Sequence, residues 1–523
     1  MASRTVPAGA GAPPAPAHDE ALLRVDNPGL LVVGIMAASL LQVLDTTIAN
    51  VAIPHMRTAL GATSETVTWV LTSYIIASAV ALPITGWLAD RVGGRRLFIL
   101  SVAGFILSSM LCGLAQNLEQ MVLFRALQGV TGAFIAPLSQ SFMLDTNKPS
   151  RQAQMMALWG MGIMIGPILG PVLGGWLTEQ VNWRWVFFVN LPIGILSLSI
   201  LLAQLPHRGA TRRRFDLIGF ALIGLALASF QMLLDRGQTL DWFDDKEIWL
   251  WTFLAVSAGW MSMIHFAMAK NPLFERALFA DRNFAIALGF MLAIGVVMFA
   301  TMALLPPMLQ QLFSYDVIDT GLVLMPRGIG VLISMQFAGM SMRRGIDSRP
   351  VVAVGFAICA VSLWQMSQWS LGVDRFHIVL SGLVQGLGMG LVFIPLNVSA
   401  FATLPPHLRT DGSSLLNLFR SLGASAGISL TTVMLARNIQ TSHADVASQL
   451  TGASVSSVVD VSTVDRYQNL GEVVVRLLDL EANRQAAMVA FVDDFRMMMW
   501  ITLAAIPLAF IMKRGPARLR DRR

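Results

Sequence analysis

An aspartate interrupts one of the most apolar stretches of the sequence. SLLQVLDTTIANVAIP (39–54) belongs to an uncharged run that begins near Pro28 and is long enough to cross a membrane, yet it contains Asp45. A charge at the bilayer centre costs at least ~3 kcal/mol, so such residues usually face the protein interior. At helical spacing the neighbours of Asp45 are small or polar, namely Ala38, Gln42, Ala49 and Ala52. A carboxylate shielded from bulk water can take up a proton at one membrane face and release it at the other. The alternative is a static carboxylate that is paired for structure.

A second charge lies in LFRALQGVTGA (123–133), where Arg125 follows four apolar residues. An arginine does not lose its proton in a protein, so Arg125 must be paired or lie in a polar cavity. There it can set when a neighbouring carboxylate releases a proton. Gln128, at i+3, shares its side of the helix. The alternative is an arginine that extends to the nearby interface. We therefore predict Asp45 and Arg125 as the proton-coupling residues, and leave open whether they touch.

Charged residues also surround a glycine pair in GWLADRVGGRR (86–96). Gly93 and Gly94 permit a tight turn between two helices. Asp90, Arg91 and Arg95 could form a charge relay to another helix end, which would hold one conformation closed and release it in another. The preference for positive charge on the cytoplasmic side explains the arginines, but it does not explain Asp90.

Glycines recur every four residues in GMGIMIGPILGPVLGG (160–175). They are Gly162, Gly166, Gly170 and Gly174, and they would line one groove where a second helix can approach closely. Pro167 and Pro171 would bend or loosen the same helix. Tight packing and a bend that helps to seal a transport path are both open readings.

The elements that must position these residues are membrane helices. Hydrophobic residues make up 55% of the chain and charged residues 13%, and the apolar residues come in long blocks. A crossing helix needs about 20 mostly apolar residues. By that rule the sequence predicts an all-α polytopic membrane protein with fourteen helices. They are expected at 28–53, 67–88, 97–116, 121–144, 153–178, 185–205, 215–235, 247–268, 284–310, 318–340, 351–370, 377–402, 412–436 and 492–512.

Lysine and arginine placement predicts that both termini are cytoplasmic, because alternate connections are basic and the others are acidic, as in LDWFDDKE (240–247). Residues 1–27 read as a disordered cytoplasmic tail and 514–523 as a basic cytoplasmic tail. The long outer segment 438–491 is polar, and its second half (472–491) looks helical and partly amphipathic. We expect an ordered surface excursion there; a docking element for a partner is the alternative.

Together these segments resemble the drug:proton antiporters of the major facilitator superfamily, and among them the fourteen-helix EmrB/QacA family, with the nearest likeness to its EmrB-like members. LDTTIANVAIP matches the motif of the first helix, GWLADRVGGRR the loop motif, Arg125 the arginine of the fourth-helix motif, and residues 160–175 the antiporter motif. Further similar stretches are NWRWVFFVNLPIG (182–194), MLLDRGQTLDWF (232–243) and NLFRSLGASAG (417–427).

The resemblance implies two six-helix bundles, at 28–205 and 284–513, around a central cavity, with two helices inserted at 206–283. It also implies alternating access driven by protons, with no cofactor, and hydrophobic or amphiphilic drugs as substrates. A periplasmic membrane-fusion adaptor and an outer-membrane channel would be partners of a protein in the inner (cytoplasmic) membrane. The second copy of the loop motif is degraded, since GMSMRRGIDSRP (339–350) has Arg343 where an acid is expected. Candidate cavity residues are Gln42, Gln128, Arg327, Asn417 and Arg420.

Other functional classes fit the sequence less well. An ATP-driven pump needs a phosphate-binding loop that contains a Gly-Lys pair, and none of the four lysines follows a glycine. The seven histidines are scattered, so we predict neither a metal site nor a catalytic site. We expect no nucleic-acid binding, because no basic patch lies on a soluble domain. The closest rival is a dedicated exporter of one natural metabolite that uses the same antiport machinery.

Overall fold

A computed structural model describes residues 20–63, 65–207, 213–237, 239–449 and 471–512. Most of the N-terminal tail and the whole basic C-terminal tail expected from the sequence lie outside these residues, as does the middle of the outer segment. The regular structure within the described ranges is helical. It contains fourteen helical spans that are long and apolar enough to cross a membrane, which confirms the expected number.

Some spans are single helices, whereas α2–α3, α5–α6 and α8–α9 each form one span together. The longer helices are α1 (Pro28–Ala59), α2 (Trp69–Ala81), α3 (Thr85–Val92), α4 (Gly94–Leu114), α5 (Leu118–Ala133), α6 (Ile135–Asp145), α7 (Gln152–Gln180), α9 (Asn190–Gln204), α10 (Leu217–Arg236), α11 (Lys246–Met268), α13 (Arg282–Leu312), α14 (Val317–Arg343), α15 (Ser348–Met366), α16 (Arg375–Ala402), α17 (Arg409–Gln449) and α20 (Gly471–Ile511). Two short helices are α8 (Trp185–Phe188) and α12 (Arg276–Ala280).

Polar side chains mark where several of these helices begin. The carboxylates or amides of the N-cap residues accept hydrogen bonds from backbone N–H groups of the first turn, which otherwise lack a partner. These residues are Asn117, Asp216, Asp245, Asp281, Asp316, Asp347 and Asp374. Between α3 and α4 the chain reverses at Gly93, whose φ of 95° lies in the left-handed region that glycine adopts without strain. The polar residues between apolar runs therefore help to fix the helix boundaries.

The helices form two bundles. In the first bundle, α1 packs against α7 and α9, α2 packs against α5, and α4 packs against α5 and α9. In the second bundle, α13 packs on α17, α14 packs on α16, and α15 packs on α20. The bundles meet mainly through α7 with α14 and through α6 with α17. The inserted α10 lies against α2, where the Thr72 hydroxyl donates a 2.6 Å hydrogen bond to Asp235, and α11 packs mainly on α10.

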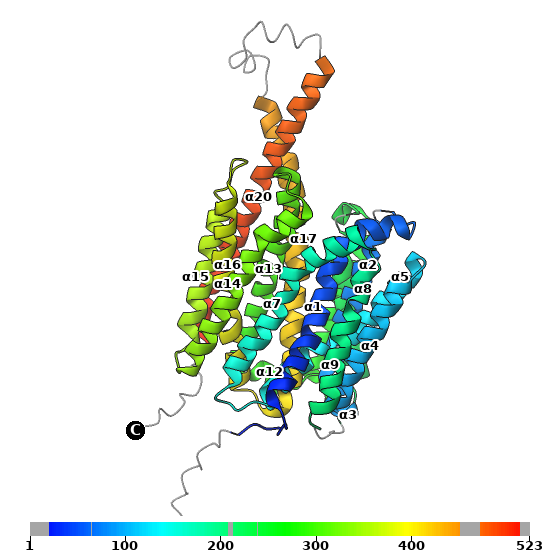
Figure 1. Ribbon diagram of the computed structural model, residues 1–523, viewed down its shortest axis with the longest axis vertical. Coiled ribbons are helices and arrows are strands. Elements are labelled where there is room, and N and C mark those ends of the chain that lie inside the picture. Colours follow the sequence, from blue (N-terminus) through cyan, green and yellow to red (C-terminus); the bar gives the residue numbers. More distant parts are fainter. Residues whose placement is uncertain (1–19, 64, 208–212, 238, 450–470, 513–523) are drawn as a thin grey trace, which may run out of the picture.

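Helices α17 and α20 continue well beyond the other helices and form a projecting pair (Figure 1). Each has 41 residues, or about 60 Å of helix, which is twice the thickness of the hydrocarbon core. His443 and Asp479 link the two helices at 2.9 Å. Residues 471–491 are helical, as the sequence predicted. Helix α17 continues through Gln449, well past residue 436, where the sequence predicted the end of this span.

The two ends of the molecule can therefore be told apart. We call the end with the projecting pair the hairpin end, and the end where α1 begins and α20 finishes the termini end (Figure 1). The glycine turn between α3 and α4 lies at the termini end.

Candidate functional site

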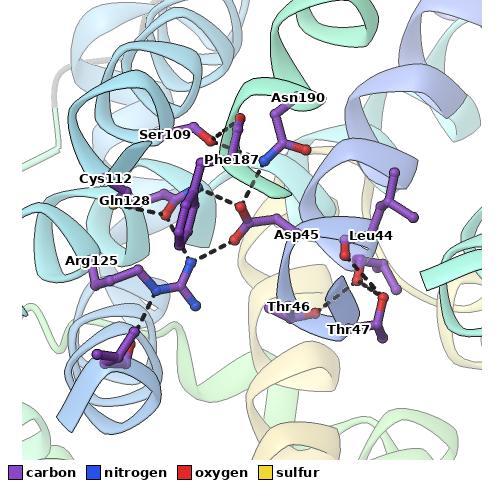
Figure 2. Close-up of polar contacts among 12 residues, drawn as sticks. Leu44, Asp45, Thr46, Thr47, Ser109, Cys112, Arg125, Gln128, Phe187 and Asn190 are labelled. Carbon is purple, nitrogen blue, oxygen red and sulfur yellow. Dashed lines mark hydrogen bonds and ion pairs between the residues drawn. The ribbon is translucent and has the colours of Figure 1, made fainter. Parts of the chain in front are cut away.

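Asp45 and Arg125 meet inside the first bundle. Nη1 of Arg125, on α5, donates a hydrogen bond of 2.7 Å to Oδ2 of Asp45, on α1 (Figure 2). Each side chain is only 1% exposed. Asp45 lies about 25 Å along α1, near the middle of the span. The contact that the sequence left open is therefore a direct, buried ion pair at membrane depth.

Two amides complete the surroundings of the carboxylate. Oδ1 of Asp45 accepts hydrogen bonds from Nε2 of Gln128 at 2.9 Å and from Nδ2 of Asn190 at 2.7 Å. Gln128 also accepts from Arg125 at 2.8 Å, and Asn190 donates to the Ser109 hydroxyl at 3.0 Å. Helices α1, α4, α5 and α9 thus each contribute a polar group. Asp45 acts as an acceptor in all three bonds, as an ionised carboxylate does.

The guanidinium is fixed on its other sides by backbone and aromatic groups. Nε of Arg125 donates to the Val70 carbonyl at 3.1 Å. The Tyr74 ring centre lies 4.5 Å from Cζ of Arg125, and the Phe187 ring centre lies 5.8 Å away. Both rings can attract the cation with their faces. Water has little access to the pair, so the protonation state of Asp45 decides whether Arg125 keeps its counter-ion.

This arrangement can link a proton to a helix contact. If Asp45 binds a proton, it loses its charge and its strongest attraction to Arg125. The uncompensated cation would then favour a rearrangement that brings it to water or to another anion, because an unpaired buried charge is costly. The cluster is thus chemically suited to respond to protons. Among the described residues, no three His, Cys, Asp or Glu side chains are placed to hold a metal ion.

The glycines of the 160–175 stretch lie on α7 and face α1. A Cβ atom added to Gly162, Gly166, Gly170 or Gly174 would meet Met36, Val43, Thr47 or Ile48, respectively. The Thr47 hydroxyl also donates to the Gly166 carbonyl at 3.3 Å. The groove that the sequence predicted therefore holds the helix that carries Asp45, and α7 runs on through Pro167 and Pro171.

These glycines should differ in how well they tolerate a methyl group. At Gly170 an added Cβ would lie 2.6 Å from Cβ of Thr47, which cannot move without its helix. At Gly162 the nearest atom is the flexible Cε of Met36, at 2.8 Å. We expect Gly170→Ala to lower stability by ~1–3 kcal/mol and Gly162→Ala to cost less. Thermal unfolding of the two variants in the same detergent checks this; equal losses would contradict it.

The predicted relay reaches the second bundle through Arg213, which lies between α9 and α10. Arg213 lies 3.9 Å from Asp90 and donates to Asp411, at the start of α17, at 2.7 and 3.3 Å. A Cβ atom on Gly86 would overlap the Asp411 carboxylate, so the helices approach closely there. Arg95 instead binds the Leu202 carbonyl near the end of α9, at 2.7 Å, and the ring of His207 just beyond that helix, at 2.9 Å. Arg91 is exposed.

Further polar contacts join the two bundles near the termini end. Arg409 pairs with Asp145 at 2.7 Å, and Ser141 and Thr410 share a hydrogen bond of 3.0 Å. Deeper along α17, Asn417 donates to Gln140 of α6 at 3.1 Å. We call this set of contacts, together with Arg213–Asp411, the closing seam.

The candidate cavity residues separate into three places. Asn417 and Arg420 lie together, and Nη2 of Arg420 donates to the Asn417 side-chain oxygen at 2.9 Å. Gln128 belongs to the Asp45 cluster, and Gln42 is half-buried on α1. Arg327 is buried inside the second bundle, where it donates to the Met298 carbonyl at 3.2 Å. The expected set is thus divided between both bundles.

Several residues of these sites were not found from the sequence. Key contacts are made by five such residues, namely Asn190, Ser109, Gln140, Arg213 and Asp411. Polar residues of these types are common near helix ends and on helix faces made of small residues, so none of them stands out in the sequence. A buried polar residue within an apolar run was the only available signal for Gln140.

Known proteins resemble this chain both in sequence and in fold. A profile of the Major Facilitator Superfamily matches residues 35–428. The multidrug export protein EmrB of Haemophilus influenzae is 37% identical over 77% of this chain and 80% of its own length. The fatty acid resistance protein FarB of Neisseria gonorrhoeae is 35% identical over 80% and 83%. The human organic anion transporter MFSD10 (TETRAN) has a similar fold, with a TM-score of 0.57 at 14% identity over 91% of this chain and 99% of its own.

Proposed function

This chain belongs to the major facilitator superfamily, among the EmrB-like members, and we propose that it is a proton-driven efflux transporter of hydrophobic or amphiphilic compounds. It is a membrane transporter rather than an enzyme. It works by alternating access, in which a central site opens first to one membrane face and then to the other. Protons moving inward through the protein drive the export of the compound, and no cofactor takes part.

The observation that carries this proposal is the buried pair of Asp45 and Arg125. A carboxylate at membrane depth that accepts three hydrogen bonds, one of them from a cation, is suited to exchange a proton for a change of helix contacts. Asp45 lies on the helix that packs in the glycine groove of α7, and α7 contacts α14 of the second bundle. A shift of α1 on protonation can therefore reach the interface between the bundles.

A dedicated exporter of one natural metabolite is the second candidate. One relative is named for resistance to fatty acids, a single class of compound, although it is 35% identical to this chain. Both candidates use the same proton-coupled mechanism. They differ in substrate range, so transport of a panel of unrelated dyes distinguishes them.

We further propose that the protein lies in the bacterial inner (cytoplasmic) membrane, with both termini cytoplasmic, and works with a periplasmic membrane-fusion adaptor and an outer-membrane channel. The projecting pair of α17 and α20 supports this, because it extends about 60 Å in all and exceeds the membrane thickness. In this topology the hairpin end faces the periplasm, where an adaptor is present. Removing the projection should then abolish adaptor capture but not dye transport by the protein alone.

Inside-out membrane vesicles test proton coupling directly. Respiration acidifies their lumen, and we expect hydrophobic dyes to accumulate inside only when the protein is present. An uncoupler should abolish the accumulation, and addition of dye to energised vesicles should partly dissipate the pH gradient. Vesicles without the protein are the control. Accumulation that survives the uncoupler would refute proton coupling, and the absence of transport for every dye would refute broad specificity.

A further inference from the structure

Arg420 is a cation near the middle of the membrane. It lies on α17, which begins at Arg409 at the termini end, so it is about 17 Å along the helix. Ionisable residues at this depth are costly and usually mark a functional site. The half-buried side chain of Arg420 points toward the interface between the two bundles, where it lines a small cavity with Gln140 of α6.

The charge of Arg420 is not balanced in the way that the charge of Arg125 is. Arg125 pairs with Asp45, whereas Arg420 donates to the neutral amide of Asn417, at 2.9 Å. Within the described part of the chain no carboxylate lies within ion-pair distance of Arg420. Arg327, in the same bundle, donates to the Met298 backbone carbonyl, which carries no full negative charge. Two arginines of the second bundle thus lie at membrane depth without a carboxylate at ion-pair distance among the described residues.

The cavity beside Arg420 is polar on one side and apolar on the other. In this conformation it is too narrow to hold a water molecule. Asn397, Gln140 and Asn417 form a chain of side-chain hydrogen bonds of 3.4 and 3.1 Å that leads to Arg420. The opposite lining comes from Met291, Phe393 and Leu416. The chemistry of this lining suits a charged head group and the first carbons of an apolar body, which can enter once the two bundles move apart here.

We propose that Arg420, with Asn417 and Gln140, forms a head-group subsite for amphiphilic anions, such as a carboxylate or sulfonate on a hydrophobic body; this rests on the proposed function as an exporter. The guanidinium donates charge-assisted hydrogen bonds to the anion, and the adjacent amides donate to its remaining oxygens. The apolar body lies against Met291, Phe393 and Leu416. Because Gln140 also bonds Asn417 across the bundles, binding here competes with one contact of the closing seam.

Two probes that differ only in charge test the subsite. They are 11-(dansylamino)undecanoic acid and its primary amide, and binding is measured by dansyl fluorescence with the full-length protein in nanodiscs of zwitterionic lipid. We expect the wild type to bind the acid about tenfold or more tightly than the amide, as a hydrogen-bonded charge pair would give. Arg420→Gln should remove this preference and leave amide binding within about twofold, whereas Arg420→Lys should keep part of it.

Arg437→Gln is the matched control, since it removes an exposed arginine from the same helix. It should bind both probes like the wild type. Equal binding of acid and amide by the wild type, or an unchanged preference in Arg420→Gln, would overturn the proposal. So would loss of acid binding when phosphatidylglycerol is added to the nanodiscs, because the site would then belong to a lipid head group. Binding does not depend on proton coupling, so failure of the proposed antiport leaves this result readable.

Discussion

Replacing Asp45 with asparagine is expected to abolish uphill efflux, reducing it to the level of vesicles that lack the protein. Asparagine has nearly the same shape and can still accept a hydrogen bond from Arg125, but it cannot carry a proton. Exchange of substrate down its own gradient should continue, because that process needs no net proton movement. Dye accumulation in energised inside-out vesicles measures the first process, and counterflow of labelled substrate measures the second.

The variant will also be less stable, and this effect must be separated from lost coupling. Removal of one partner from a buried ion pair commonly costs ~3–5 kcal/mol, because the other charge remains buried. The double variant Asp45→Asn/Arg125→Gln removes both charges. It should regain most of the lost thermal stability but none of the uphill efflux. If Asp45→Asn pumps dye at the wild-type rate, Asp45 is a static structural group and the coupling site lies elsewhere.

The sequence was most informative where a residue type conflicted with its surroundings. Asp45 and Arg125 stood out because a charge is costly in an apolar run, and both lie in one cluster. Their contact could not be derived, since it depends on how α5 is rotated against α1 and α2. The two amide donors are harder still to recognise. Gln128 was expected in a cavity and instead binds Asp45, and Asn190 lies at a helix start, where a polar residue is unremarkable.

The distribution of apolar residues predicts the number of membrane helices better than it predicts their lengths. The hydrocarbon core requires about 20 apolar residues per span, so counting apolar runs gave the fourteen spans. The same rule ended the thirteenth span near residue 436 and began the fourteenth near residue 492, at the borders of the polar segment between them. A helix can continue into water, because its backbone hydrogen bonds are internal, and α17 and α20 do so. Their mutual packing, which the sequence does not reveal, supports that extension.

The relay motif illustrates a third limit. Asp90 was recognised as unexplained, but its route to the second bundle passes through Arg213, which is one of three consecutive arginines in a basic connection. Positive charge is expected in such a connection whether or not it has a role. Asp411 is equally ordinary as an acid in the first turn of a helix. Only their spatial arrangement identifies the pair that links the bundles.

Loss of Arg213 is expected to open the termini end of the protein. Asp411 is 2% exposed and receives two hydrogen bonds from Arg213, so Arg213→Gln leaves a buried carboxylate without its cation in the closed state. Opening would return that carboxylate to water. The cost of a broken buried pair, ~3–5 kcal/mol, would shift the equilibrium toward the open state by a factor on the order of 100–5,000. Arg409 and Asp145 still hold the seam, so the observed shift will be smaller.

A cysteine placed inside the seam reports this opening. Ser141 is buried and faces Thr410 across the bundles, so Ser141→Cys should react slowly with N-ethylmaleimide while the termini end is closed. Adding Arg213→Gln should speed labelling at least ~10-fold, given the expected equilibrium shift. Arg214→Gln is the control, because this neighbouring arginine is exposed. Addition of Asp411→Asn to Arg213→Gln should slow labelling again, since no buried charge then remains unpaired. Rapid labelling in that double variant would instead mean that the ion pair itself holds the seam closed, and slow labelling in Arg213→Gln alone would show that the seam does not depend on this pair.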